Sequence, residues 1–176
     1  KLNALKPWTL VNLVLSGGGE KGIAHVALLE KLEDLQLKIN AISATSAGSL
    51  VGTMYASGMR FQEIIEFFTQ TTLFKYSWLN PLNAGFFKSE KYEVYLKEHV
   101  KSNFEDLPFP MYVTATNMED GECIYFHSGP LIKPIIASCA VPGIFSPVEI
   151  DGKLYSDGGV MDNFPIFPFR QDPLPI

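Results

Sequence analysis

The residue best suited to chemistry is Ser46, which stands among small residues where an apolar stretch gives way to a helical pattern. A serine at a sharp turn from a strand into a helix can expose its hydroxyl as a nucleophile, and its neighbours must be small because bulky ones would collide. The usual form of this nucleophile elbow is Gly-x-Ser-x-Gly; here Ala44 replaces the first glycine and Gly48 supplies the second. A serine in this setting also suits a helix N-cap, so the stretch alone leaves both interpretations open.

A glycine-rich loop is the second feature with chemical potential. Gly17, Gly18 and Gly19 follow an apolar run and precede a helical pattern, so their backbone N–H groups can face an anion. A phosphate site is one interpretation, although no Gly-Lys-Ser/Thr step completes a P-loop and the spacing to Gly22 fits a dinucleotide fold only loosely. The other interpretation is an oxyanion hole for a tetrahedral intermediate. Nucleotide binding therefore stands as an alternative to acyl transfer.

A serine nucleophile needs a group that accepts its proton, and Asp157 is the candidate. A carboxylate can act directly when it lies within hydrogen-bond reach of the hydroxyl. The two residues that follow, Gly158 and Gly159, leave room beside the carboxylate, although an Asp-Gly step is also a common turn.

A Ser-His-Asp triad is the alternative arrangement, because the chain contains three histidines, His25, His99 and His127. His127 is the strongest of them, since it falls in a loop and loops often carry catalytic groups. An α/β-hydrolase triad places its histidine last in the chain, and no histidine follows Asp157. This order favours a Ser–Asp pair.

The elements that must position these residues follow the order of a parallel α/β sheet. Apolar runs predict buried strands over 10–15 and 39–42, which end at the glycine loop and at Ser46. Between them, a helix is expected to place Leu28, Leu32 and Leu35 on its apolar face, with Ala24 and Ala27 allowing close packing on the sheet. A second helix follows Ser46 and closes at Gly58. Adjacent parallel strands end at one edge of a sheet, so the loop should lie beside Ser46.

The rest of the chain is expected to form mainly structural helices and hairpins. Helices are expected over 61–68, from Ser89 to Val100 and over 131–140, and hairpins over 111–126 and 147–155. Residues 73–87 are rich in aromatic side chains without clear periodicity. They are expected to cover the core, and the alternative is an acyl-chain pocket wall or an interfacial surface.

Composition narrows the class of protein. The 176 residues predict a single domain over 1–176, with 47% hydrophobic and 19% charged residues. A formal charge of −5 without a basic run gives no reason to expect nucleic acid as a partner. Cys123 and Cys139 do not form a metal or redox spacing, so buried thiols are expected. No signal peptide or membrane span is visible, which favours a cytoplasmic location, with membrane association as the alternative.

Four sequence blocks in this order resemble the patatin-like phospholipase family over residues 11–165. They are Gly-Gly-Gly-Glu-Lys-Gly at 17–22, Ala-Thr-Ser-Ala-Gly-Ser at 44–49, Ala-Ser-Cys-Ala-Val-Pro-Gly-Ile-Phe-Ser-Pro-Val at 137–148 and Asp-Gly-Gly-Val-Met-Asp-Asn-Phe-Pro at 157–165. The resemblance implies a three-layer α/β/α fold with a central, mostly parallel sheet. It also implies a serine lipid acyl hydrolase without a metal or organic cofactor, with Ser46 as nucleophile, Asp157 as its base and Gly17, Gly18 and Gly19 as the oxyanion loop. The implied substrates are phospholipids, lysophospholipids or other lipid esters, met through peripheral membrane contact.

Two positions depart from the family pattern. Ala44 replaces the first glycine of the elbow, and Lys21 stands where arginine is common, which keeps the charge but loses the planar fork. A lipid-binding protein that keeps the fold with an inactive elbow is therefore the non-enzymatic alternative. The chain does not begin with methionine and its tail is broken by prolines where family domains continue with helices, so completeness at either end is left open.

Overall fold

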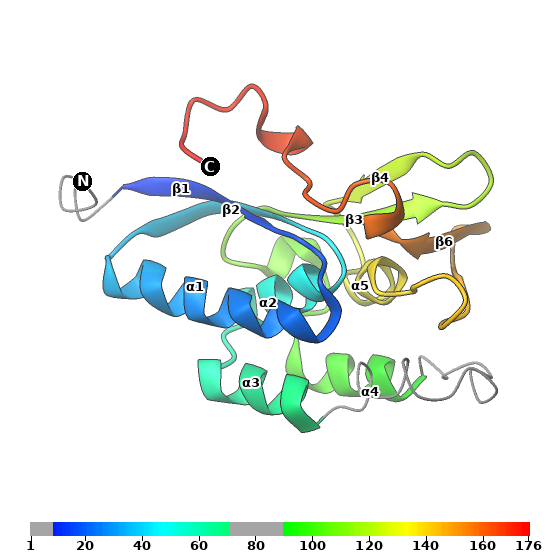
Figure 1. Cartoon of the computed structure of the whole chain (residues 1–176), viewed down its shortest axis with the longest axis horizontal. Helices are drawn as coiled ribbons and strands as arrows, with labels where there is room; N and C mark the ends of the chain where they lie inside the picture. Colours follow the sequence, from blue (N-terminus) through cyan, green and yellow to red (C-terminus); the bar gives the residue numbers. More distant parts are fainter. Residues whose placement is uncertain (1–8, 71–89) are drawn as a thin grey trace.

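The structure of the chain, a computed structural model, describes residues 9–70 and 90–176 (Figure 1). The aromatic stretch over 73–87 and the expected helix start at Ser89 lie outside these residues. The strands are β1 (Leu10–Leu15), β2 (Lys38–Ala44), β3 (Met111–Asn117), β4 (Cys123–Phe126), β5 (Val148–Ile150) and β6 (Lys153–Asp157). The α-helices are α1 (Ala24–Asp34), α2 (Ala47–Ala56), α3 (Phe61–Gln70), α4 (Glu90–His99) and α5 (Ile132–Ser138). Short 3-10 helices are η2 (Gly19–Ile23), η3 (Phe104–Asp106), η4 (Gly158–Val160) and η5 (Phe167–Phe169).

The strands form one mixed sheet. β1, β2 and β3 are parallel neighbours, whereas β4 and β6 each pair with β3 in the antiparallel sense and β5 pairs antiparallel with β6. β5 therefore runs in the same direction as β1, β2 and β3, and most strands share one direction. The predicted α/β class with this type of sheet is confirmed, as are both predicted hairpins.

Strand β3 has a neighbour on each edge at three of its positions, Val113, Ala115 and Thr116. Their partners are Ala44 and Phe126 for Val113, Asp157 and Ile124 for Ala115, and Ser156 and Cys123 for Thr116. Because a strand residue pairs once on each side, β4 occupies one edge of β3 and β2 shares the other edge with β6. The carboxyl ends of β2 and β6 thus face each other along β3, with Thr114 between Val113 and Ala115. This topology brings the elbow and the Asp-Gly-Gly block together.

The two faces of the sheet are covered differently. Leu13 and Leu15 point to the face that the α-helices cover, and the intervening Val14 points to the opposite face, as the pleat requires. On that opposite face the C-terminal segment packs through Phe169. Near its end, the Pro175 carbonyl accepts a hydrogen bond from the backbone amide of Asn12 at 2.8 Å. Figure 1 shows the helices below the sheet and this segment above it. The described chain thus has a layer of α-helices, the sheet, and a third layer on the opposite face of the sheet. This third layer consists of 3-10 turns and extended chain rather than of α-helices.

The apolar face expected for the first helix was wrong in part, since Leu32 packs against the core but Leu28 does not. Leu28 is 41% exposed and Ala24 and Ala27 are also exposed, whereas Val26 and Leu29 are buried. Val26, Leu29 and Leu32 recur every three residues and pack in the core, so the buried side of the helix passes through them rather than through Leu28. Leu28 then points roughly 200° away from Val26 around the helix axis.

Candidate active site

Ser46 occupies a sharp turn between β2 and α2. Its backbone angles are φ 50° and ψ −123°, which is a strained conformation for a residue other than glycine. Gly48 is required here, because a Cβ at that position would run into the carbonyl oxygen of Leu15 at the end of β1. Ala44 precedes the turn as the last residue of β2, and its methyl group is fully buried in the core. The elbow therefore forms with alanine at this position.

The hydroxyl of Ser46 faces the carboxylate of Asp157. Ser46 Oγ donates to Asp157 Oδ2 at 2.7 Å, and both residues are buried. The other carboxylate oxygen, Oδ1, accepts the Gly159 amide at 2.7 Å. Burial raises the pKa of Asp157, while the hydrogen bonds from Ser46 and Gly159 act in the opposite direction. The arrangement pairs a hydroxyl with a buried carboxylate, which is a geometry suited to proton transfer.

The Asp-Gly-Gly block is fixed closely to β3 and to the end of α5. The Asp157 amide donates to the Ala140 carbonyl at 2.9 Å, and the Asp157 carbonyl accepts the Thr116 hydroxyl at 2.9 Å. At the next residue, Gly158, a Cβ would collide with the backbone and hydroxyl of Thr114. Gly159 has somewhat more room, since a Cβ there would lie 2.8 Å from Asn163 Oδ1 and 3.0 Å from Asp157 Oδ1.

The glycine loop lies beside Ser46, as expected. It borders an open cleft of about 300 Å³ lined by Gly17, Gly18, Gly19, Ser46, Val141, Pro142, Asp157, Gly159, Val160 and Asn163. A Cβ on Gly17 would lie 3.2 Å from the Cβ of Ser46, so the loop passes close to the elbow. Gly17 donates its amide to the Asn163 carbonyl at 3.4 Å. Within the described residues no acceptor is bonded to the amides of Gly18 and Gly19, which begin the turn η2.

Lys21 and Gly22 hold the loop rather than the reacting pair. Lys21 is exposed, and its amide closes the turn by donating to the Gly18 carbonyl at 3.2 Å. Gly22 is buried against α2, where a Cβ would collide with the Cβ of Ala47.

The three histidines lie in other settings. His25 Nε2 is hydrogen-bonded to the Ser16 carbonyl at 2.9 Å, at the start of the glycine loop. His99 is hydrogen-bonded to the Tyr95 carbonyl at the end of α4, and His127 is exposed against the ring of Tyr112. In the part of the chain that the structure describes, the hydrogen-bond partner of the Ser46 hydroxyl is Asp157.

No group of three or more His, Cys, Asp or Glu side chains in residues 9–70 and 90–176 is arranged to hold a metal ion. Cys123 and Cys139 are free and partly buried. None of the helices described combines the length and the apolar character that crossing a membrane requires.

A sequence model described as patatin-like phospholipase matches residues 13–170, which is most of the chain. The chain belongs to the patatin-like phospholipase family. The expectation of a serine ester hydrolase is thereby confirmed at the level of the family.

Relatives of this patatin-like chain come from bacteria and fungi. An uncharacterised NTE family protein of Mycobacterium tuberculosis is 34% identical over 161 residues, which cover 90% of this chain and 45% of that protein. Lysophospholipase NTE1 of Cryptococcus neoformans is 30% identical over 176 residues, which cover 92% of this chain and 10% of that protein. This chain therefore spans less than half the length of these curated relatives.

A solved structure supports the patatin-like fold. The crystal structure of VipD from Legionella pneumophila matches with a TM-score of 0.61, covering 89% of this chain and 47% of that chain. The sequence identity is 16%, so this likeness concerns the fold alone.

The patatin-like site includes residues that sequence reasoning did not single out. Ser138 Oγ accepts the amide of Ser46 at 2.8 Å and is fully buried. Thr45 Oγ1 and Thr114 Oγ1 lie 2.6 Å apart directly beneath the elbow. Ser138 and Thr45 lie within two of the four sequence blocks that resemble the family, so the sequence did give a signal for these two residues. Thr114 on β3 lies in none of the blocks.

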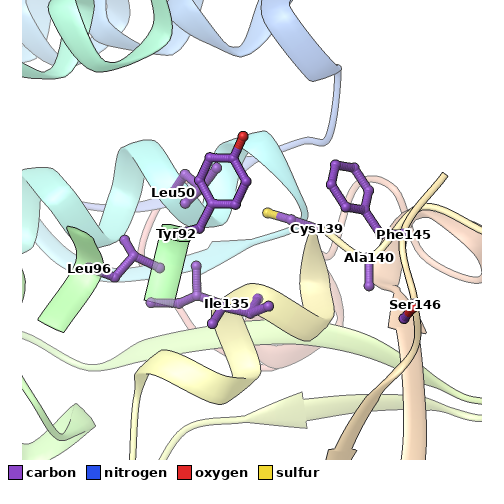
Figure 2. Close-up of a pocket in the computed structure, with 9 residues that line it drawn as sticks. Leu50, Tyr92, Leu96, Ile135, Cys139, Ala140, Phe145 and Ser146 are labelled. Atoms are coloured by element: carbon purple, nitrogen blue, oxygen red, sulfur yellow. The ribbon is translucent and has the colours of Figure 1, made fainter. Parts of the chain in front are cut away.

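A narrow apolar pocket lies behind the site (Figure 2). It has a volume of about 30 Å³ and is lined by Leu50, Tyr92, Leu96, Ile135, Ile136, Cys139, Ala140, Phe145 and Ser146. The segment 139–146 separates it from the cleft, because Val141 and Pro142 line the cleft while Cys139 and Phe145 line the pocket. Burial and the nearby Asp157 carboxylate raise the pKa of the Cys139 thiol.

Proposed function

We propose that this chain is the catalytic domain of a lipid acyl hydrolase in which Ser46 is the nucleophile and Asp157 the general base. The observation that carries the proposal is the 2.7 Å hydrogen bond from Ser46 Oγ to Asp157 Oδ2 at a strained strand-to-helix turn. A serine hydroxyl becomes a useful nucleophile when a neighbouring base accepts its proton. The family and the two hydrogen-bonded side chains thus support the same reaction.

The first half of the reaction forms an acyl-enzyme. Ser46 Oγ attacks the ester carbonyl carbon while its proton passes to Asp157 Oδ2. The negative charge on the carbonyl oxygen is stabilised by backbone amides, for which Gly18 and Gly19 are the candidates because both residues line the cleft and donate no backbone hydrogen bond among the described residues. When the tetrahedral intermediate collapses, the proton on Asp157 passes to the leaving alcohol. Water then repeats these steps at the acyl carbon and releases the fatty acid, with Asp157 accepting and returning the proton.

The apolar pocket of Figure 2 supports a lipid substrate. Its walls are almost entirely hydrocarbon, and Cys139 and Ala140 in its wall directly precede Val141 and Pro142 of the cleft. An acyl chain that crosses Val141 and Pro142 from the cleft would widen this pocket of about 30 Å³ as it enters and would remove apolar surface from water. Fungal relatives carry the name lysophospholipase, so we propose phospholipids or lysophospholipids as the substrate class.

Peripheral contact with a lipid surface accompanies this proposal. Val160 lines the cleft and is 54% exposed, and Met161, Phe164 and Phe167 of the same segment are exposed as well. Exposed apolar side chains beside a cleft suit contact with an interface. This segment would contact the lipid surface and so bring the opening of the cleft close to the lipid.

Turnover measurements test the proposed function. The wild type, Ser46→Ala and Asp157→Asn are compared on the soluble ester p-nitrophenyl butyrate and on lysophosphatidylcholine micelles, with circular dichroism to show that each variant is folded. The wild type should hydrolyse both substrates, and each variant should lose most of its kcat. A folded wild type without turnover would favour the lipid-binding alternative. Stabilisation by a nucleotide that survives Ser46→Ala would favour nucleotide binding instead.

A further inference from the structure

Thr45 has no part in the reaction as described, yet it lies between the end of β2 and the nucleophile. Its side chain is fully buried. Its hydroxyl donates to the Asp162 carbonyl at 2.9 Å and lies 2.6 Å from the hydroxyl of Thr114. Thr45 thus touches both the central strand and the segment that follows Asp157.

The direction of these hydrogen bonds follows from counting protons. Each hydroxyl has a single hydrogen, and a carbonyl oxygen can only accept. Because Thr45 gives its hydrogen to the Asp162 carbonyl, the hydrogen in the 2.6 Å contact comes from Thr114. The Ala44 carbonyl, at 3.4 Å from Thr114 Oγ1, is the more distant acceptor. The hydroxyl of Thr45 is therefore the central member of a chain from β3 to Asp162.

Asp162 is itself joined to the segment that carries the base. The Asp162 amide donates to the Gly158 carbonyl at 2.9 Å, one residue after Asp157. The Asp162 carboxylate accepts the Tyr125 hydroxyl at 2.6 Å, so its position is fixed from β4 as well. A shift of Thr45 relative to Asp162 would therefore change the separation of Ser46 from Asp157.

We propose that Thr45 is a positioning residue whose hydroxyl sets the distance between Ser46 Oγ and the Asp157 carboxylate. The inference rests on the proposed function. β2 and β6 meet along β3 without a hydrogen-bond ladder between them, so side chains must join their ends. Thr45, adjacent to Ser46, makes that junction with Thr114 and Asp162. A misplacement of about 1 Å in such a pair can reduce a rate about 100-fold.

The test compares Thr45→Val, which keeps the shape and removes the hydroxyl, with Thr45→Ser, which keeps the hydroxyl. The readouts are kcat and KM on p-nitrophenyl butyrate, with thermal unfolding to show that each variant is folded. Thr45→Val should lower kcat about 10- to 100-fold and leave KM within about twofold, because positioning acts on the chemical step. Thr45→Ser should restore kcat to within about threefold of the wild type.

The matched control is Thr53→Val. Thr53 is a fully buried threonine on α2 whose hydroxyl contacts the Met111 sulfur at 3.5 Å and is remote from the dyad contacts. This variant loses a buried hydroxyl of the same kind, so it should keep the kcat of the wild type.

The pH dependence of kcat/KM distinguishes positioning from a general loss of structure, because a general loss would not shift the pH of the acid limb. The hydrogen bond from Ser46 holds the pKa of Asp157 down, so a lengthened Ser46–Asp157 contact should raise it. The acid limb of kcat/KM should therefore move to higher pH in Thr45→Val and return in Thr45→Ser.

Thr114→Val provides a second variant in case Thr45→Val does not fold. It removes the donor to Thr45 but leaves the Thr45–Asp162 hydrogen bond, so kcat should fall about 2- to 5-fold, with rescue by Thr114→Ser. Wild-type kcat in a folded Thr45→Val or Thr114→Val, or failure of the serine variants to rescue, would overturn the inference. A wild type without turnover would instead overturn the proposed function, and this inference with it.

Discussion

At the scale of single residues, the central feature is a carboxylate buried against a hydroxyl. Burial raises the pKa of Asp157 because a charged carboxylate loses its hydration, and the hydrogen bonds from Ser46 and Gly159 compensate only in part. A raised pKa makes this carboxylate a stronger base than an aspartate in water. The same buried setting strengthens its interaction with the transferred proton.

This base predicts the pH dependence of catalysis. The active form of Asp157 is the carboxylate, so activity should fall as the pH falls through its pKa, and the acid limb should lie above the ordinary aspartate range. The measurement is kcat/KM on p-nitrophenyl butyrate against pH. His127→Ala should leave the limb unchanged. A limb that disappears in this variant would contradict the assignment of the base.

At the scale of elements, the elbow depends on close contact between α2 and the end of β1. The turn at Ser46 is strained, and the helix that follows must pass directly over the Leu15 carbonyl. A strained active-site turn of this kind persists because the surrounding packing fixes it. The glycines of the motif therefore have different roles, some for space and some for exposed amides.

Gly48→Ala should destabilise the chain, because the added methyl collides with backbone that cannot move aside. The expected loss in the free energy of unfolding is about 1–3 kcal/mol, the usual cost of overpacking. Urea denaturation measures it. The control is Gly18→Ala, where the nearest atoms to a new Cβ lie 3.8 Å away, so its stability should equal that of the wild type. Equal stabilities of the two variants would contradict this account of the elbow.

The pocket between α2, α4 and α5 predicts selectivity for acyl chains. Leu50 is buried one turn after Ser46 and lines this pocket, so Leu50→Phe should fill part of it. We expect kcat/KM on p-nitrophenyl palmitate to fall about tenfold relative to p-nitrophenyl butyrate, a cost typical of one or two methylene groups. Leu154→Phe, at an exposed position of β6, should leave the ratio unchanged. An unchanged ratio in Leu50→Phe would place the acyl chain elsewhere.

At the scale of the whole molecule, the site is held at the expense of stability. The folded state keeps Asp157 buried with its pKa above that of the unfolded chain. The folded state therefore binds the proton more tightly, and stability is lost as pH rises from the unfolded pKa to the folded one. Natural active sites commonly show this opposition between stability and function.

Asp157→Asn should consequently be more stable than the wild type at pH 7, because asparagine carries no charge to bury. The difference should shrink as the pH is lowered and the wild-type carboxylate becomes protonated. Thermal unfolding of both proteins between pH 4 and pH 7 measures it. A wild type that is the more stable protein at pH 7 would show that the hydrogen bonds of the carboxylate outweigh its desolvation.

Much of this molecule could be predicted from residue patterns. The runs over 10–15 and 39–42 are apolar enough to be recognised as strands, and the Asp-Gly turns marked both hairpins. That β2 and β6 both pair with the same edge of β3 could not be predicted, because local sequence patterns do not indicate which distant strand ends meet. The side chains at that junction, Thr45 and Thr114, were missed for the same reason. The orientation of Leu28 was wrong because the apolar spacing fits one face through Leu28 and another through Val26 and Leu29, and only tertiary packing selects between them.

The most direct test of the central claim is labelling with a fluorophosphonate probe and mass mapping of the modified residue, because such a probe reports an activated serine without knowledge of the substrate. The wild type, Ser46→Ala, Asp157→Asn and His127→Ala are compared, each shown to be folded. The account predicts modification at Ser46, no modification in Ser46→Ala, labelling slowed about 100-fold or more in Asp157→Asn and wild-type labelling in His127→Ala. Labelling that survives Asp157→Asn but disappears in His127→Ala would contradict the Ser46–Asp157 pair, and a folded wild type that stays unlabelled would contradict the hydrolase itself.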